Sequence, residues 1–313
     1  MSSSPTNTGK HDEVTFLSHG VECAAWHFTA EGDALATPAG RTAVVMAHGL
    51  AGTVDSGLAP FAERLAGAGL DVLAFDYRGF GASSGSPRQT VSIADQVEDY
   101  RAAMTAAAAL PGVDPQRLVL WGVSLSGGHV LEAAADRSDV AAVVSLTPLV
   151  DGLAAGRHAL ASHKPSEMAR STFAGLRSKV SAASGRPAVM MPVVAQPGEM
   201  GALTLEGSYD DYLAIAGPTW RNEIDAAMGF ELGNQRSAKV ADRIASPVLV
   251  QIADFDRSAP PHASAKAAFK ARAEVRHYPC DHFDVWPGKP WFEAAADHQV
   301  EFLARQLTRV TTE

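Results

Sequence analysis

Apolar residues gather into short continuous runs along the chain, and these runs alternate with amphipathic segments. The apolar runs predict buried strands, and the segments between them predict helices. We expect early strands at 14–17 and 21–28, later strands at 43–47, 71–75, 118–121 and 140–146, and helices near 59–68, 92–110 and 125–136. Strands that are apolar throughout and separated by helices are typical of a parallel sheet covered on both faces.

The pattern is interrupted after residue 150. Residues 151–243 favour helix at first and then become rich in Pro, Gly and Met. Strand patterns resume at 247–252 and 274–278, and a helix is expected near 291–307. Because pieces of one sheet flank residues 151–243, we interpret them as an insertion rather than an independent domain. The predicted organisation is therefore a flexible tail (1–12), the first part of an α/β core (13–150), an inserted lid (151–243) and the last part of the core (244–313).

The composition places the chain among globular proteins, since 46% of its 313 residues are apolar and 19% are charged. Its net charge of −9 argues against nucleic acid as a partner. The two cysteines, Cys23 and Cys280, cannot form a disulfide framework or a four-cysteine zinc site. We expect neither a cofactor nor a metal.

The amino-terminal residues are polar and lack the apolar core of a secretory signal. No apolar run approaches the ~18 residues that a membrane span requires. We therefore expect a cytoplasmic protein without a membrane partner. The sequence leaves its oligomeric state open, including a homo-oligomer.

The sharpest chemical signal is Gly122-Val-Ser124-Leu-Ser126-Gly-Gly128, which joins a predicted strand to a predicted helix. A serine on such a tight turn presents its hydroxyl above the edge of the sheet, and small residues are needed on either side of it. Gly122 fills the first of these positions and Ser126 the second. Ser124 is the expected nucleophile because Gly122 directly follows the apolar strand. With Ser126 as nucleophile, Ser124 and Gly128 would be the small residues.

A nucleophilic serine needs a base and an oxyanion hole. The backbone N–H groups of Leu50, after the predicted strand 43–47, and Leu125 are the expected oxyanion donors. An acid followed by a histidine is expected after the late strands. Asp256 is preferred to Asp254 as the acid because it lies further out on its loop, and His282 follows the strand at 274–278.

With these residues in place, the chain resembles the α/β-hydrolase superfamily over nearly its whole length beyond the tail. The resemblance rests on His48-Gly49, the loop 76–83, the turn 122–128, Asp256 with Pro260, and Asp281-His282-Phe283. More closely, the chain is similar to bacterial serine hydrolases with a Gly-x-Ser-x-Ser-Gly-Gly-His turn. These are related to the serine-aminopeptidase-like and X-Pro-dipeptidyl-peptidase-like groups and to polyketide transferases. The resemblance implies an α/β-hydrolase fold with Ser124 as nucleophile, Asp256 as acid and His282 as base. The sequence departs from the family pattern at Ser126 and at Asp281, where glycine is usual.

The leading functional hypothesis is a serine hydrolase that cleaves a carboxylic ester or thioester through an acyl-enzyme. An acyltransferase or a peptidase could use the same three residues, and a non-catalytic ligand-binding module is the hypothesis from another class. The substrate is expected to be a small acyl compound. Met190, Met191 and Trp220 of the insertion are candidates for the wall of an adaptable apolar pocket. They could equally form a small core of the insertion.

Overall fold

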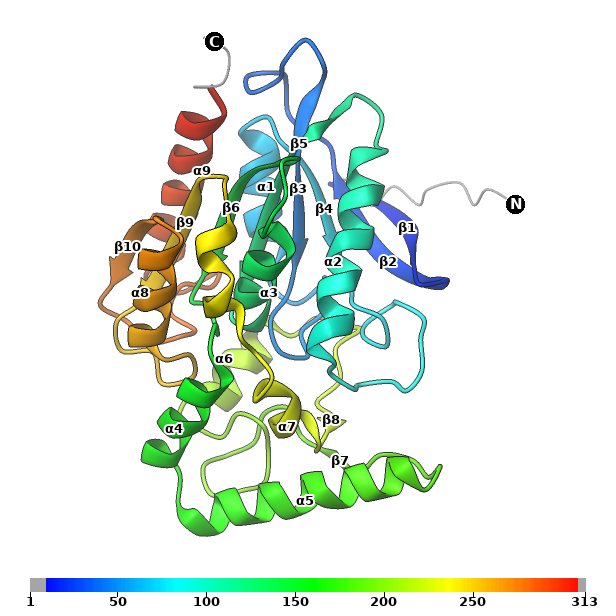
Figure 1. The fold of residues 1–313 in the computed structure, drawn as a ribbon, viewed down its shortest axis with the longest axis vertical. Helices are drawn as coiled ribbons and strands as arrows, with labels where there is room; N and C mark the ends of the chain where they lie inside the picture. The colour runs from blue at the N-terminus through cyan, green and yellow to red at the C-terminus, as the bar shows by residue number, and fades with distance from the viewer. Residues whose placement is uncertain (1–9, 309–313) are drawn as a thin grey trace.

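The computed structural model describes residues 10–308 and contains an eight-stranded sheet (Figure 1). Its strands are β1 (Asp12–Ser18), β2 (Val21–Phe28), β3 (Arg41–Ala47), β4 (Asp71–Phe75), β5 (Val113–Val123), β6 (Val140–Leu146), β9 (Val248–Ala253) and β10 (Glu274–Tyr278). They lie in the order β1-β2-β4-β3-β5-β6-β9-β10. Only the pairs β1–β2 and β2–β4 are antiparallel, so the predicted mostly parallel sheet is confirmed.

Helices cover both faces of this sheet. They are α1 (Ala59–Gly67), α2 (Ile93–Ala108), α3 (Leu125–Ala134), α8 (Pro261–Lys270) and α9 (Phe292–Thr308). Helix α1 contacts α9, and α2 contacts α3, which gives two helical layers around the sheet. Every residue of β4 and all but the first residue of β3 are buried, as expected for parallel strands that have helices on both sides.

Aromatic packing joins the sheet to the layer of α1 and α9. The ring of Phe61 in α1 lies 5.2 Å from Trp121 of β5 and 4.9 Å from Phe292 of α9. Trp121 is fully buried, and its indole N–H donates a 2.9 Å hydrogen bond to Gln299 of α9. Burying the indole is tolerated because its one polar atom has a partner.

The amino-terminal segment differs from the expected tail at its last residues. β1 begins at Asp12, which pairs with His27 of β2, and the His11 ring stacks on Trp26 at 4.1 Å. The amino group of Lys10 lies 2.7 Å from a carboxylate oxygen of Glu63 in α1. Residues 1–9, the rest of the expected tail, lie outside the described residues.

The chain leaves the sheet after β6 and returns to it at β9, and these two strands are adjacent and parallel. We call residues 151–243 between them the inserted segment and the rest of the described chain the body. The inserted segment forms α4 (Gly152–Ser162), α5 (Pro165–Ala183), β7 (Met190–Met191), α6 (Ser208–Ile215), β8 (Ile224–Asp225), α7 (Met228–Leu232), and the 3-10 turns η1 (Ser237–Lys239) and η2 (Ala241–Arg243). Figure 1 shows α4 and α5 at the lower end of the molecule, beyond the body.

Local sequence signals fix the two longest helices of the inserted segment. The Asp151 carboxylate accepts hydrogen bonds from the backbone N–H groups of Leu153 and Ala154, so α4 begins with a capped first turn. Pro165 occupies the first position of α5, where the missing N–H costs nothing. Glu167 accepts a hydrogen bond from the Lys164 N–H, which satisfies a further donor at this end.

Candidate active site

Ser124 lies on a sharp turn between β5 and α3. Its backbone angles are φ 58° and ψ −119°, a conformation that residues other than glycine rarely adopt. The turn leaves no room for a side chain at residue 122, since a Cβ there would lie 2.3 Å from the carbonyl oxygen of Ser126. Strain of this kind is maintained where it positions a reactive group.

Ser126, the residue in place of the usual glycine, turns its hydroxyl toward the sheet. The side chain is fully buried, and its Oγ accepts a 2.8 Å hydrogen bond from the Val123 N–H. The same hydroxyl lies 2.8 Å from the Ala47 carbonyl oxygen, to which it can donate. This geometry favours Ser124 over Ser126 as the nucleophile.

His282 and Asp256 form a buried pair. The imidazole Nδ1 lies 2.6 Å from Asp256 Oδ2, and the two residues are only 4% and 3% exposed. The other Asp256 oxygen accepts hydrogen bonds from the N–H groups of Ser258 and Ala259, which fixes the carboxylate. Burial lowers the pKa of His282, but the charge and hydrogen bond of Asp256 outweigh it, so the pKa lies above its ordinary value.

The competing aspartate, Asp254, lies elsewhere. Its Oδ1 is 2.6 Å from Nδ1 of His277, and both side chains are exposed. The third histidine of this region, His298, contacts the hydroxyl of Tyr278. Of these two aspartates and three histidines, only Asp256 and His282 form a buried pair whose histidine lines the cavity described below.

The backbone around Gly49 runs directly against Ser124. A Cβ at Gly49 would lie 2.8 Å from the Ser124 Cβ, so only glycine permits this approach. Leu50 and Leu125, whose N–H groups are the expected oxyanion donors, both line the same cavity as Ser124. Leu125 is the first residue of α3, and an N–H in the first turn of a helix has no carbonyl partner within that helix.

Two side chains that the sequence did not identify as functional hold the loop between β3 and α1 (residues 48–58), which we call the Leu50 loop. Asp76 accepts a 2.6 Å hydrogen bond from the Val54 N–H and a 2.9 Å bond from Ala82 N–H. Burial raises the pKa of Asp76 to about 7, partly offset by these bonds. The hydroxyl of Tyr212, on α6 of the inserted segment, donates a 2.7 Å hydrogen bond to the Leu50 carbonyl oxygen. What Asp76 and Tyr212 share is a buried polar group, which the folded structure shows and the sequence does not.

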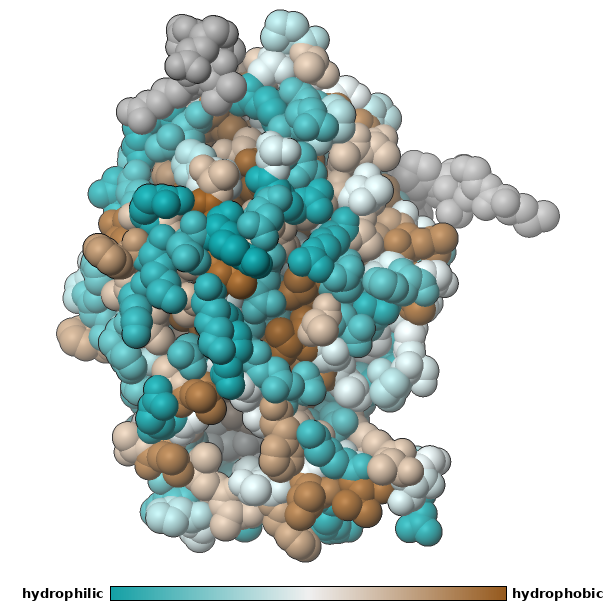
Figure 2. Space-filling view, viewed as in Figure 1, coloured by the Kyte–Doolittle hydropathy of each residue, from teal (hydrophilic) through white to brown (hydrophobic). Residues whose placement is uncertain are grey.

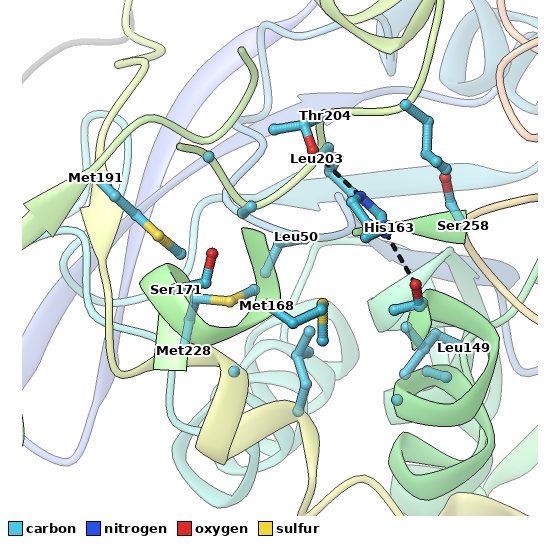
Figure 3. A pocket seen from close by; sticks show the side chains of 18 of the residues that line it. Leu50, Leu149, His163, Met168, Ser171, Met191, Leu203, Thr204, Met228 and Ser258 are labelled. Atoms are coloured by element: carbon cyan, nitrogen blue, oxygen red, sulfur yellow. Dashed lines mark hydrogen bonds between the residues drawn. The ribbon is translucent and has the colours of Figure 1, made fainter. Parts of the chain in front are cut away.

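A cavity of about 310 Å³ opens between these groups and the inserted segment. Ser124, Leu125 and His282 form part of its wall on the side of the body, together with Arg257 and Ser258. The opposite wall comes from the inserted segment, and Figure 3 shows Met168, Met191 and Met228 grouped near Leu50. The cavity is therefore mainly apolar beyond Ser124.

Of the three pocket candidates from the sequence, Met191 lines this cavity. Met190 pairs with Asp225 in the two-stranded ribbon β7–β8, and neither it nor Trp220 is among the lining residues. Trp220 instead lies against the ring of Tyr212 at 5.1 Å, within the inserted segment. Neighbouring strand residues point to opposite faces, so only one of Met190 and Met191 can reach the cavity.

His163 and Thr204 are a hydrogen-bonded polar pair among the residues that line the cavity. His163 Nδ1 lies 3.0 Å from the Ala159 carbonyl oxygen, and its Nε2 lies 3.1 Å from Thr204 Oγ1 (Figure 3). The carbonyl can only accept, so Nδ1 of His163 donates to it. Within residues 10–308, no group of three or more His, Cys, Asp or Glu side chains is placed to hold a metal ion. None of the helices in these residues has the length and apolar character of a membrane span.

Comparison with protein families supports the fold and the broad class. Residues 42–289 match the family model described as the alpha/beta hydrolase fold. The quorum-quenching protein AidA of Acinetobacter baumannii is 34% identical to this chain over 296 residues, which are 94% of each protein. The thiohydrolase aneE of Aspergillus aculeatus is 40% identical over 109 residues, 35% of this chain and 34% of its own.

A solved structure has the same architecture. The crystal structure of the alpha/beta hydrolase GrgF from Penicillium sp. sh18 superposes with a TM-score of 0.77, at 23% identity. The match covers 95% of this chain and 99% of the other one.

Proposed function

The chain belongs to the α/β-hydrolase family, and we propose that it is a serine hydrolase that cleaves a carboxylic ester or thioester. The observation that carries this proposal is the buried pair of His282 and Asp256, whose imidazole lines the same cavity as Ser124. An activated serine needs a base that is itself oriented by a third group. The body supplies all three groups: Ser124 and His282 line one mainly apolar cavity, and Asp256 is buried in contact with His282.

In the proposed reaction, His282 Nε2 accepts the Ser124 proton while Oγ attacks the carbonyl carbon. Asp256, bonded to Nδ1, keeps the imidazole in the required tautomer and stabilises its positive form. The N–H groups of Leu50 and Leu125 donate hydrogen bonds to the carbonyl oxygen and stabilise the negative charge that develops on it. The protonated His282 then gives its proton to the leaving alcohol or thiol, which leaves an acyl group on Ser124.

The acyl-enzyme is resolved when His282 activates a water molecule, which releases the acid. An alcohol or amine in place of that water would give acyl transfer, the second reaction that these residues support. The apolar wall with Met168, Met191 and Met228 suits the acyl group, because methionine side chains adapt to different shapes. The 34% identity to a quorum-quenching protein makes bacterial quorum-sensing signals a class of substrate to test.

The test is labelling with a fluorophosphonate, followed by peptide mapping, in the wild type and in Ser124→Ala and Ser126→Ala variants. We expect the label on Ser124, absent from Ser124→Ala and retained in folded Ser126→Ala. Hydrolysis of the best ester or thioester should fall at least about 10⁴-fold in Ser124→Ala. A folded wild-type protein that takes no label would overturn the proposal.

The products separate the two reactions. We expect the free acid as the main product when a model alcohol is added to the best substrate. A product dominated by the new ester would instead identify the protein as an acyltransferase that uses the same acyl-enzyme.

A further inference from the structure

Large apolar side chains that are exposed concentrate in the inserted segment. In the described part of the chain there are eleven of them, and eight lie between residues 151 and 243. These eight are Leu153, Leu160, Phe173, Leu176, Val180, Met200, Leu213 and Phe230. Single exposed apolar side chains are ordinary, but a concentration in one part of a surface indicates contact with something else.

Three of the eight lie along one side of α5. Phe173, Leu176 and Val180 are 63%, 54% and 60% exposed, and Ala169 precedes them on the same side of the helix. We call these four residues the α5 ridge. Figure 2 shows apolar surface at the lower end of the molecule, where Figure 1 places α5 as the outermost element.

The opposite side of α5 is fully occupied. Ala174, Gly175 and Ser178 are buried there, and a Cβ at Gly175 would lie 2.8 Å from the Ala226 carbonyl oxygen. Met168 and Ser171 line the cavity. The helix is therefore held to the protein by its inner side, and the side chains of the ridge are mostly exposed to solvent.

Cations accompany the ridge. Residues 164–186 hold five basic residues (Lys164, Arg170, Arg177, Lys179 and Arg186) and one acidic residue, a net charge of +4 in a chain of −9. All five basic side chains are exposed. Within the described residues none of the five is paired with a carboxylate, although Arg170 donates to the Gly198 carbonyl and Lys179 lies over the Phe230 ring.

We propose that the α5 ridge and its cations dock the protein on the surface of an anionic lipid bilayer. An interfacial helix presents apolar side chains to the acyl region while its Lys and Arg side chains reach the headgroups. The arrangement on α5 has both parts. The helix lies along the surface and does not span it, so a transmembrane stretch is not required.

The charge argues for this occupant over the alternatives. A second copy of the chain would bring two surfaces of net charge +4 together, which is repulsive. A protein partner would need a groove shaped for the outermost helix of the molecule, whereas a lipid surface adapts to a protruding ridge. An anionic lipid surface also attracts cations by about 1 kcal/mol for each Lys or Arg near it.

The test is sedimentation with vesicles of phosphatidylcholine, alone or mixed with phosphatidylglycerol, at low and high salt. We expect wild-type protein to bind the mixed vesicles at low salt. Binding should be weaker to the mixed vesicles at high salt, and weaker to vesicles of phosphatidylcholine alone. Phe173→Ser/Leu176→Ser and Arg177→Glu/Lys179→Glu should each weaken binding about tenfold or more. Both double variants should keep wild-type activity on a water-soluble ester.

Helix α8 offers matched controls. Phe269 is 86% exposed and Lys266 is exposed on the same helix, so Phe269→Ser and Lys266→Glu make the same kinds of change on the body, at one residue each. Their binding should match the wild type. The proposal is overturned if wild-type protein does not bind mixed vesicles at low salt, or if the α8 variants weaken binding as much as the α5 variants. A concentration-dependent dimer abolished by the α5 ridge variant would also overturn it. The binding measurement does not depend on catalysis.

Discussion

The body and the inserted segment handle their apolar residues in opposite ways. In the body, strands such as β3 and β4 are buried almost throughout, and only three large apolar side chains of the described residues are exposed. In the inserted segment, α5 turns one side to the cavity and the other to solvent. The comparison indicates that packing fixes the proposed catalytic groups in the body, whereas the inserted segment forms a cavity wall and exposes apolar side chains to solvent.

The largest expected effect tests whether the reaction depends on the buried pair of the body, Asp256 and His282. Asp256→Asn should lower kcat/KM about 10³- to 10⁴-fold, because the imidazole loses the group that fixes its tautomer. Asp254→Asn is the matched control, since Asp254 pairs with exposed His277, and should leave the rate within about twofold of the wild type. Equal losses in the two variants would remove Asp256 from its assigned role. The measurement is steady-state hydrolysis of the best ester.

Two phenylalanines test the difference in packing. Phe61→Ala removes a fully buried ring that contacts Trp121 and Phe292, and should lower the free energy of unfolding by about 3–5 kcal/mol. Phe173→Ala on the α5 ridge should change it by no more than about 0.5 kcal/mol. Urea unfolding followed by tryptophan fluorescence measures both. A large loss in Phe173→Ala would show that the ridge packs against something in the free protein.

Tyr212 sharpens the comparison because it links the two regions. Tyr212→Phe removes the donor to the buried Leu50 carbonyl, and an unpaired buried acceptor costs about 1–3 kcal/mol. We expect kcat to fall about tenfold with little change in KM, since the affected loop carries an oxyanion donor. Tyr209→Phe, on the same helix, is the control. An unchanged kcat in Tyr212→Phe would mean that the Leu50 loop is held by the body alone.

The smallest expected effect is on pH dependence. His282 must be neutral to accept a proton, and its pKa lies above the ordinary value because Asp256 outweighs burial. The activity should therefore be lost as pH falls through a value above about 6.5. In Asp256→Asn the residual activity should persist to lower pH, because burial then lowers the pKa of His282 without the opposing charge and hydrogen bond of Asp256. Profiles of kcat/KM against pH measure the shift. A wild-type limb at or below about 6.5 would contradict it.

The body could be predicted from the sequence because its signals are redundant. Continuous apolar runs mark the strands, and Gly122, Ser124 and Gly128 mark the turn after β5. Asp256 and His282 follow their strands in the order that the family resemblance implies. Ser124, Asp256 and His282 thus follow β5, β9 and β10, in the order in which these strands occur along the chain.

The inserted segment could not be predicted to the same depth. Its apolar residues serve the cavity, a small core and the outer surface, and no periodicity distinguishes these uses. Met191 lines the cavity while Met190 and Trp220 are not among the lining residues, a difference set by the two-residue strand β7 and by contacts with Tyr212. The link from Tyr212 to Leu50 joins residues far apart in the sequence, so only the folded chain brings it into view.

The adjacency of β6 and β9 has a consequence for how this protein can change. Because β6 and β9 pair directly, the hydrogen bonds between them need no contribution from the residues that separate them in the sequence. Insertions, deletions and substitutions there can alter the cavity wall and the outer surface while the strands keep their alignment. Substrate range can thus diversify among descendants of one ancestor while Ser124, Asp256 and His282 keep their places in the body.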